Sequence, residues 1–72
     1  MLMDVLNQYD FLVNTHTERL LNQITHDIGD EEVAVHVAIL AFEKLWYHLE
    51  KHDCPMDVEQ WLALEAKRFY AK

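Results

Sequence analysis

The residues that could carry out chemistry lie close together in the stretch WYHLEKHDCPMD. His48 and His52 are four residues apart, a spacing that places two side chains on one face of a helix, and Asp53 or Cys54 could supply a third zinc ligand. Structural zinc sites normally have four ligands, however, and Glu50 lies between the histidines in the order HLEKH, which is not the HExxH pattern of metalloproteases. We therefore predict no metal site, and a zinc-binding module using His48 and His52 remains the alternative.

Cys54 and His52 are also a candidate pair of nucleophile and base. The sequence offers no third residue to orient the histidine, and its single glycine leaves no glycine-rich loop for an oxyanion hole. A chain of 72 residues also gives little depth to a substrate pocket. We predict no catalytic residue, no enzymatic activity and no cofactor.

The elements that must position these residues are helices. Glycine and proline each occur once, whereas β-hairpins and sandwiches need many turn residues, so the composition predicts an all-α fold. Apolar residues recur every three or four positions from residue 4 to residue 28, which predicts one long helix. The polar run NTHTER could instead begin a second helix through a capping box of Thr15 and Glu18. Because the apolar period continues across this run, we favour an unbroken helix.

Two residues mark the boundary between the first and second helices. Gly29 is expected to end the first helix, because glycine adopts the left-handed backbone conformation without steric cost. Asp30 is expected to cap the second helix, which we predict over residues 31–52. Pro55 prevents that helix from continuing.

The third helix is predicted over residues 58–70. Asp57 and Gln60 have the spacing of a capping box at its start. Met56 and Trp61 have the spacing of a hydrophobic staple, in which the two apolar side chains pack together across the first turn.

The second helix carries apolar residues on two sides. One side forms a continuous face of Val35, Ala38, Phe42, Leu45, Trp46 and Leu49. The opposite side carries a second stripe of Val33, Val37, Leu40 and Tyr47. A helix that is apolar all round is normally buried, and a short third helix covers only part of it. We predict a long antiparallel helical hairpin plus a short third helix, completed as a homodimeric helical bundle through the second stripe. The alternative is that the third helix folds back over this stripe.

The net charge of −7 is unevenly distributed. Residues 1–43 contain eight acidic residues and one base, Arg19, whereas residues 44–72 contain five acidic and five basic residues. Nucleic acids bind basic surfaces, so we expect no nucleic acid partner. A protein with a basic surface is the electrostatic complement. The candidate partner-binding residues form the acidic corner between the first two helices: Asp27, Asp30, Glu31 and Glu32.

The sequence favours one helical domain over residues 1–72 in the cytoplasm. Its single cysteine cannot form an internal disulfide, which suits a reducing compartment. The N-terminus has no basic residue ahead of an apolar stretch, and the uncharged run over residues 33–42 is shorter than a membrane span of about 20 residues. We therefore expect no targeting segment and no membrane association.

Together these features predict a small, acidic, non-enzymatic regulator or inhibitor that acts by protein–protein interaction as a helical homodimer. Short acidic domains without catalytic residues include many regulators encoded by phages and plasmids. Besides the zinc-binding module, an acidic mimic of nucleic acid is an alternative. It is weaker, because the acidic residues cluster in one turn and are scattered elsewhere.

Overall fold

The computed structural model describes residues 4–71, and these form three helices and no strand. They are α1 (Val5–Ile28), α2 (Glu31–Lys51) and α3 (Val58–Tyr70). The all-α prediction is confirmed. The expected bounds differ from those of the structure by one residue at the start of α1 and one at the end of α2. Residues 1–3 and 72 of the predicted domain lie outside the described residues.

The helices begin and end at the residues with capping chemistry. The Asp4 carboxylate accepts a hydrogen bond from the Asn7 backbone N–H at 2.8 Å, and so caps α1. Gly29 follows Ile28 with φ of 80°, in the left-handed region where a side chain would add strain. Asp30 then caps α2, its Oδ1 accepting from two backbone N–H groups at 3.0 and 3.2 Å.

The start of α3 is capped by Asp57, whose Oδ1 accepts a hydrogen bond from the Gln60 backbone N–H at 3.0 Å. The predicted hydrophobic staple is wrong, because the Met56 side chain is fully exposed. Trp61 packs against the core, and its ring centroid lies 5.1 Å from that of His48 on α2. The Trp61 indole thus contacts another helix and not Met56, whose side chain remains in solvent.

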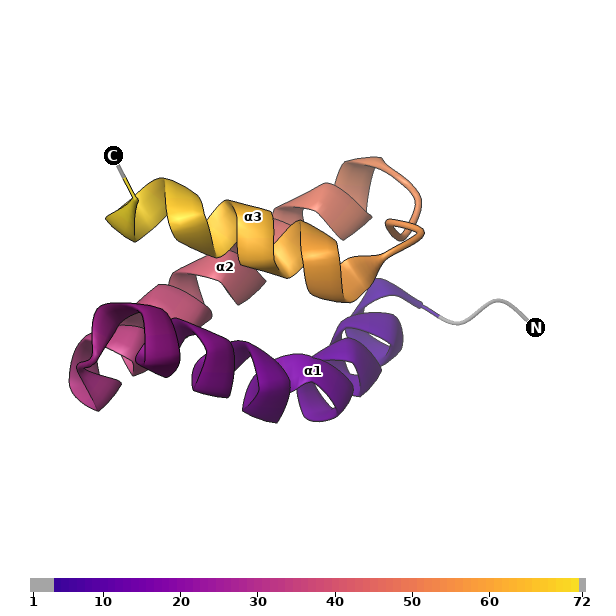
Figure 1. Ribbon diagram of the computed structural model, residues 1–72. Helices are drawn as coiled ribbons and strands as arrows, with labels where there is room; N and C mark the ends of the chain where they lie inside the picture. Colours follow the sequence, from indigo (N-terminus) through magenta and orange to yellow (C-terminus); the bar gives the residue numbers. More distant parts are fainter. Residues whose placement is uncertain (1–3, 72) are drawn as a thin grey trace.

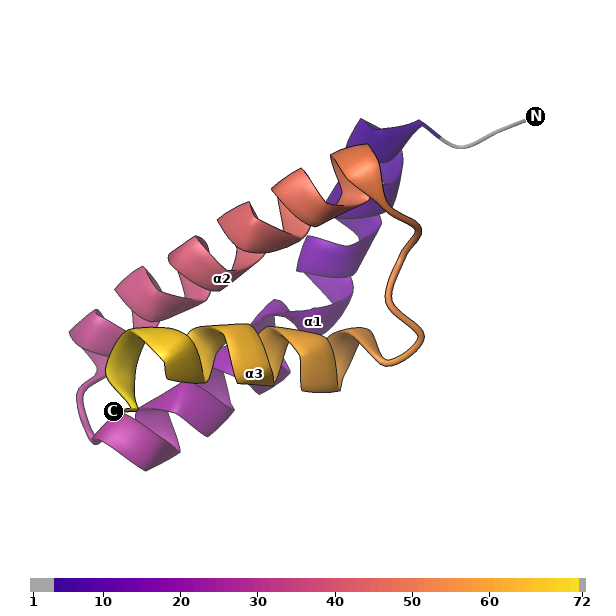
Figure 2. The same ribbon diagram turned by 90° about the horizontal axis from the view of Figure 1, so that it is seen from above.

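Helix α1 continues through the NTHTER run but is bent along its length (Figure 2). The Thr15 hydroxyl donates to the Phe11 carbonyl oxygen at 2.7 Å, and the Thr17 hydroxyl donates to the Val13 carbonyl oxygen. Threonine hydroxyls that bond to the carbonyl one turn earlier commonly bend a helix. These two bonds therefore give a local cause for the curvature, and no second helix begins within the run.

Helix α2 packs against both of the other helices, which lie in front of it in Figure 1. Its fully buried residues are small or branched: Ala34 and Ala41 have no exposed surface, and neither has Leu45. Ala66 of α3 is also fully buried, so the backbones of the helices can approach one another closely. The core is completed by larger side chains of all three helices: Leu12, Leu20, Ile24, Phe42, Leu49, Val58 and Leu62.

The two apolar sides predicted for α2 are divided differently in the structure. Val37 was expected in the exposed stripe, but it is only 6% exposed and belongs to the chain's own core. Val35 was expected in the buried face, but it is exposed at the edge of that face. The buried side of α2 is centred on Ala34, Ala41 and Leu45. Both α1 and α3 pack on this side, and together they cover a wider part of the α2 surface than one helix could.

Candidate functional site

The histidine pair at the end of α2 takes part in packing. The His48 and His52 ring centroids are 4.9 Å apart with an interplanar angle of 34°, and His48 also contacts Trp61. Within residues 4–71, no group of three or more His, Cys, Asp or Glu side chains is arranged to hold a metal ion. The zinc-binding alternative therefore finds no third ligand beside the pair in this part of the chain.

Cys54 lies half-buried in the loop between α2 and α3. Burial raises the pKa of its thiol above the ordinary value. A reactive cysteine needs a lowered pKa, because the thiolate is the nucleophile. The surroundings of Cys54 thus act against the nucleophilic role considered from the sequence.

The predicted acidic corner separates into structural and outward-facing carboxylates. Asp30 is the N-cap of α2, and Asp27 accepts a hydrogen bond from the Tyr70 hydroxyl at 3.0 Å, joining the end of α1 to the end of α3. Burial raises the pKa of Tyr70, and the hydrogen bond to Asp27 and its negative charge raise it further. Glu31 and Glu32 are exposed in the first turn of α2, where the helix dipole favours negative charge. Glu31 and Glu32 are therefore the members of the corner that face solvent without such a structural role.

The predicted self-association stripe is reduced to three residues. Val33, Leu40 and Tyr47 are 43%, 38% and 54% exposed, and each is seven residues from the next. A seven-residue spacing keeps side chains in line along a helix, as in the contact line of a coiled coil. The surviving stripe thus runs along α2, away from its buried arc.

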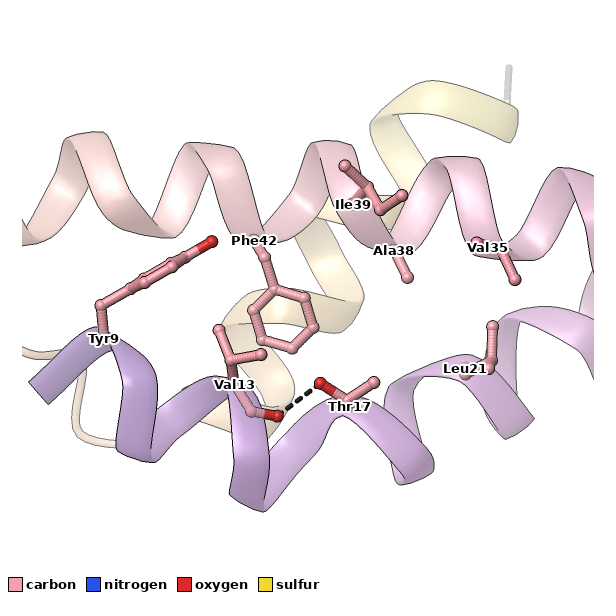
Figure 3. Close-up of a pocket in the computed structure, with 8 residues that line it drawn as sticks. All are labelled: Tyr9, Val13, Thr17, Leu21, Val35, Ala38, Ile39 and Phe42. Carbon is pink, nitrogen blue, oxygen red and sulfur yellow. Dashed lines mark hydrogen bonds between the residues drawn. The ribbon is translucent and has the colours of Figure 1, made fainter. Parts of the chain in front are cut away.

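An apolar groove that the sequence did not predict lies between α1 and α2 (Figure 3). It has a volume of about 240 Å³ and is lined by Tyr9, Val13, Thr17 and Leu21 of α1 and by Val35, Ala38, Ile39 and Phe42 of α2. Helix α3 lies behind the two helices in this view, so the groove opens on the side that α3 does not cover.

Small side chains in the middle of the groove help to keep it open. Thr17 of α1 and Ala38 of α2 are both short, while Phe42 fills the space beside Val13 (Figure 3). The groove could not be predicted from the apolar period. The period identifies which residues are apolar, but it does not show which residues of one helix face which residues of the other. Ile39 was predicted on neither apolar side of α2. In the structure it is 59% exposed and lines the groove.

The polar atoms in the groove lining are already engaged or lie at its end. The Thr17 hydroxyl donates to the Val13 carbonyl oxygen. The Tyr9 ring packs edge-on against Trp46, with centroids 5.2 Å apart and an interplanar angle of 78°. Burial raises the pKa of Tyr9, and the negative charge of Glu43 raises it further. The groove is thus suited to apolar contact rather than to acid–base chemistry.

None of the helices within residues 4–71 combines the length and apolar character needed to cross a membrane. No protein-family model, curated protein or solved structure matches the chain.

Proposed function

We propose that this protein is a small, non-enzymatic regulator or inhibitor that acts in the cytoplasm by binding another protein. In this proposal, the long antiparallel hairpin of α1 and α2 is completed as a homodimeric helical bundle. The observation that carries the proposal is the uncovered apolar surface of α2, where five large apolar side chains remain exposed: Val33, Val35, Ile39, Leu40 and Tyr47.

Self-association is supported by the stripe of Val33, Leu40 and Tyr47. Burying these side chains against a second copy would stabilise the dimer by about 25 cal/mol for each Å² of apolar surface removed from water. A domain of this size has a small core, so added burial in a dimer would be a considerable gain in stability. A two-fold axis would place the same stripe on both sides of the contact.

A basic partner is supported by the distribution of charge. The acidic half of the chain holds α1 and the first half of α2, and its single base, Arg19, forms an ion pair with Glu59 of α3 at 3.3 Å. Glu31 and Glu32 are exposed at the start of α2. A partner with Lys or Arg at its surface would be attracted over a range of about 8 Å at physiological ionic strength.

Sedimentation velocity across a range of concentrations tests the dimer. We expect a concentration-dependent dimer for the wild type, and a dissociation constant at least about tenfold higher for Leu40→Glu, which puts a charge into the stripe. Leu64→Glu is the matched control, because Leu64 is an exposed leucine on α3. A wild type that sediments as an 8.6 kDa monomer throughout would refute the dimer.

Affinity capture with matched charge variants tests the basic partner. The double variant Glu31→Lys, Glu32→Lys reverses the exposed charges and leaves the Asp30 cap intact. The control is Glu50→Lys, a charge reversal at an exposed position in the second half of α2. We expect a specific partner to bind the wild type and Glu50→Lys and to be lost with the double variant, with circular dichroism showing all three folded. Equal retention by all three would remove acidic docking from the proposal.

A further inference from the structure

The groove between α1 and α2 has the length of a short helix. Its α1 wall extends from Tyr9 to Leu21, which at 1.5 Å per residue is about 18 Å. Its α2 wall is formed by Val35, Ala38, Ile39 and Phe42. Since α3 packs on the other side of the two helices, a further helix laid in this groove would cover the side that the chain leaves open (Figure 3).

The lining favours apolar side chains over a polar small molecule. Six of its eight residues have no polar side-chain atom, and the Thr17 hydroxyl is bonded to the carbonyl of its own helix. A site that recognises a polar metabolite places a few convergent polar groups in its pocket. Helix-in-groove recognition instead requires apolar anchors at intervals of three, four and seven residues.

Carboxylates lie near both ends of the groove. Glu43 is four residues after Ile39 and so on the same side of α2, and its negative charge raises the pKa of Tyr9 at this end of the groove. At the other end, one shallow surface depression is lined by Glu31, Glu32, Val35 and His36. Asp10 is exposed on α1, seven residues before Thr17 and so on the same side of that helix.

Neither the arginine nor the lysine nearest to the groove neutralises this rim. Arg19 is paired with Glu59 of α3. Lys44 is five residues after Ile39, which places it about 140° round α2 from the groove. A second copy of the chain would bring the same carboxylates against those of the first, and like charges repel. Charge complementarity therefore favours an occupant of opposite charge.

We infer that the α1–α2 groove binds an amphipathic helix of the partner protein, with leucine-like anchors on one face and Lys or Arg residues flanking them. This inference rests on the proposed protein-binding function and names the partner's chemistry. The anchors contact Val13, Leu21, Val35 and Ile39, and the flanking bases face the carboxylates of the rim.

Fluorescence anisotropy with a designed peptide tests the inference. The probe is a labelled 18-residue helical peptide with leucine along one face and lysine elsewhere. A second peptide has the same composition in an order that leaves no apolar face. We expect the amphipathic peptide to bind at least about tenfold more tightly than the scrambled peptide, because both carry the same charge and only one presents aligned anchors.

Protein variants locate the binding. Ile39→Ser should weaken binding of the amphipathic peptide about tenfold or more, since it removes an aliphatic contact. Leu64→Ser, at a position 56% exposed compared with 59% for Ile39, should leave the affinity unchanged. Glu43→Gln, which leaves Glu31 and Glu32 unchanged, should weaken binding and reduce its dependence on salt.

Three results would overturn the inference. Equal binding of both peptides would show a general attraction between opposite charges. Equal affinity of Ile39→Ser and wild type would place the peptide elsewhere. Release of monomer from a wild-type dimer by the peptide would show that a second copy occupies the groove. The first two results leave the proposed function standing, because the dimer is tested with Leu40 and the charge-dependent partner by reversing Glu31 and Glu32, and neither result depends on those residues. The third would leave a dimer standing but would place its contact in the groove and not on the stripe of Val33, Leu40 and Tyr47.

Discussion

Replacing Asp30 with alanine should destabilise the protein even though the side chain is exposed. Asp30 Oδ1 accepts hydrogen bonds from the Glu32 and Val33 backbone N–H groups at 3.0 and 3.2 Å. In Asp30→Ala these two donors at the start of α2 lose their partner. Loss of an N-cap of this kind costs about 1 kcal/mol, within a range of about 0.5–2 kcal/mol. In a domain of 60–100 residues, this corresponds to a fall in melting temperature of about 4–8 °C.

Urea unfolding monitored by circular dichroism at 222 nm measures this change. Asp30→Asn separates the cap from the charge, because asparagine caps a helix about as well as aspartate but is neutral. The Asp30→Asn variant should therefore keep a free energy of unfolding within a few tenths of a kcal/mol of the wild type. Glu31→Gln should also have a small effect, since Glu31 accepts no cap hydrogen bond and gains only from the helix dipole. If Asp30→Ala is as stable as the wild type, or Asp30→Asn loses as much as Asp30→Ala, the capping argument is refuted.

Two substitutions and one alkylation experiment probe the core, a contact between helices and the free thiol. Leu45→Ala should cost about 2–5 kcal/mol, measured by urea unfolding, because Leu45 has no exposed surface and its removal leaves a cavity. Tyr70→Phe should cost about 0.5–1 kcal/mol, since the bond to Asp27 is exposed. Because the pKa of Tyr70 is raised in the folded state, its contribution is full below about pH 10 and is lost as the pH rises through the folded value. Melting curves should therefore show a smaller alkaline loss of stability for Tyr70→Phe, and an equal loss would contradict this. Cys54 should react with iodoacetamide more slowly in the folded protein than in urea at pH 8.5, because burial raises its pKa.

The helices could be predicted from the sequence because their boundaries depend on local chemistry. Gly29, Asp30 and Asp57 each act through hydrogen bonds or backbone angles within four residues of themselves. Such contacts form in the same way whatever lies on the far side of the molecule. The hydrophobic staple failed because it competes with a long-range contact: Trp61 packs beside His48 on α2, and Met56 is left in solvent.

The division of α2 into covered and exposed arcs could not be predicted from its period. A helical wheel orders Val35, Val37 and Ile39 around the axis but does not say where α1 and α3 are placed on it. In the structure, Val37 is covered and Val35 and Ile39 are not. The groove also depends on which residues of α1 face α2, and on the curvature of α1, whose threonine hydroxyls bond to their own helix. These features follow from the packing of three helices together.

The two proposed contacts of α2 respond to salt in opposite ways, because the same acidic charge acts on both. Two copies that each carry −7 repel one another, so added salt screens the repulsion and should strengthen a dimer that forms through Val33, Leu40 and Tyr47. A basic helix in the groove is attracted by the same charge, so added salt should weaken its binding. The free energy of burying apolar surface changes little with moderate salt. It therefore cannot by itself strengthen the dimer and weaken the binding of the basic helix. If both contacts weakened with salt, the contact between copies would be held by opposite charges, and the apolar stripe on α2 would not be its basis.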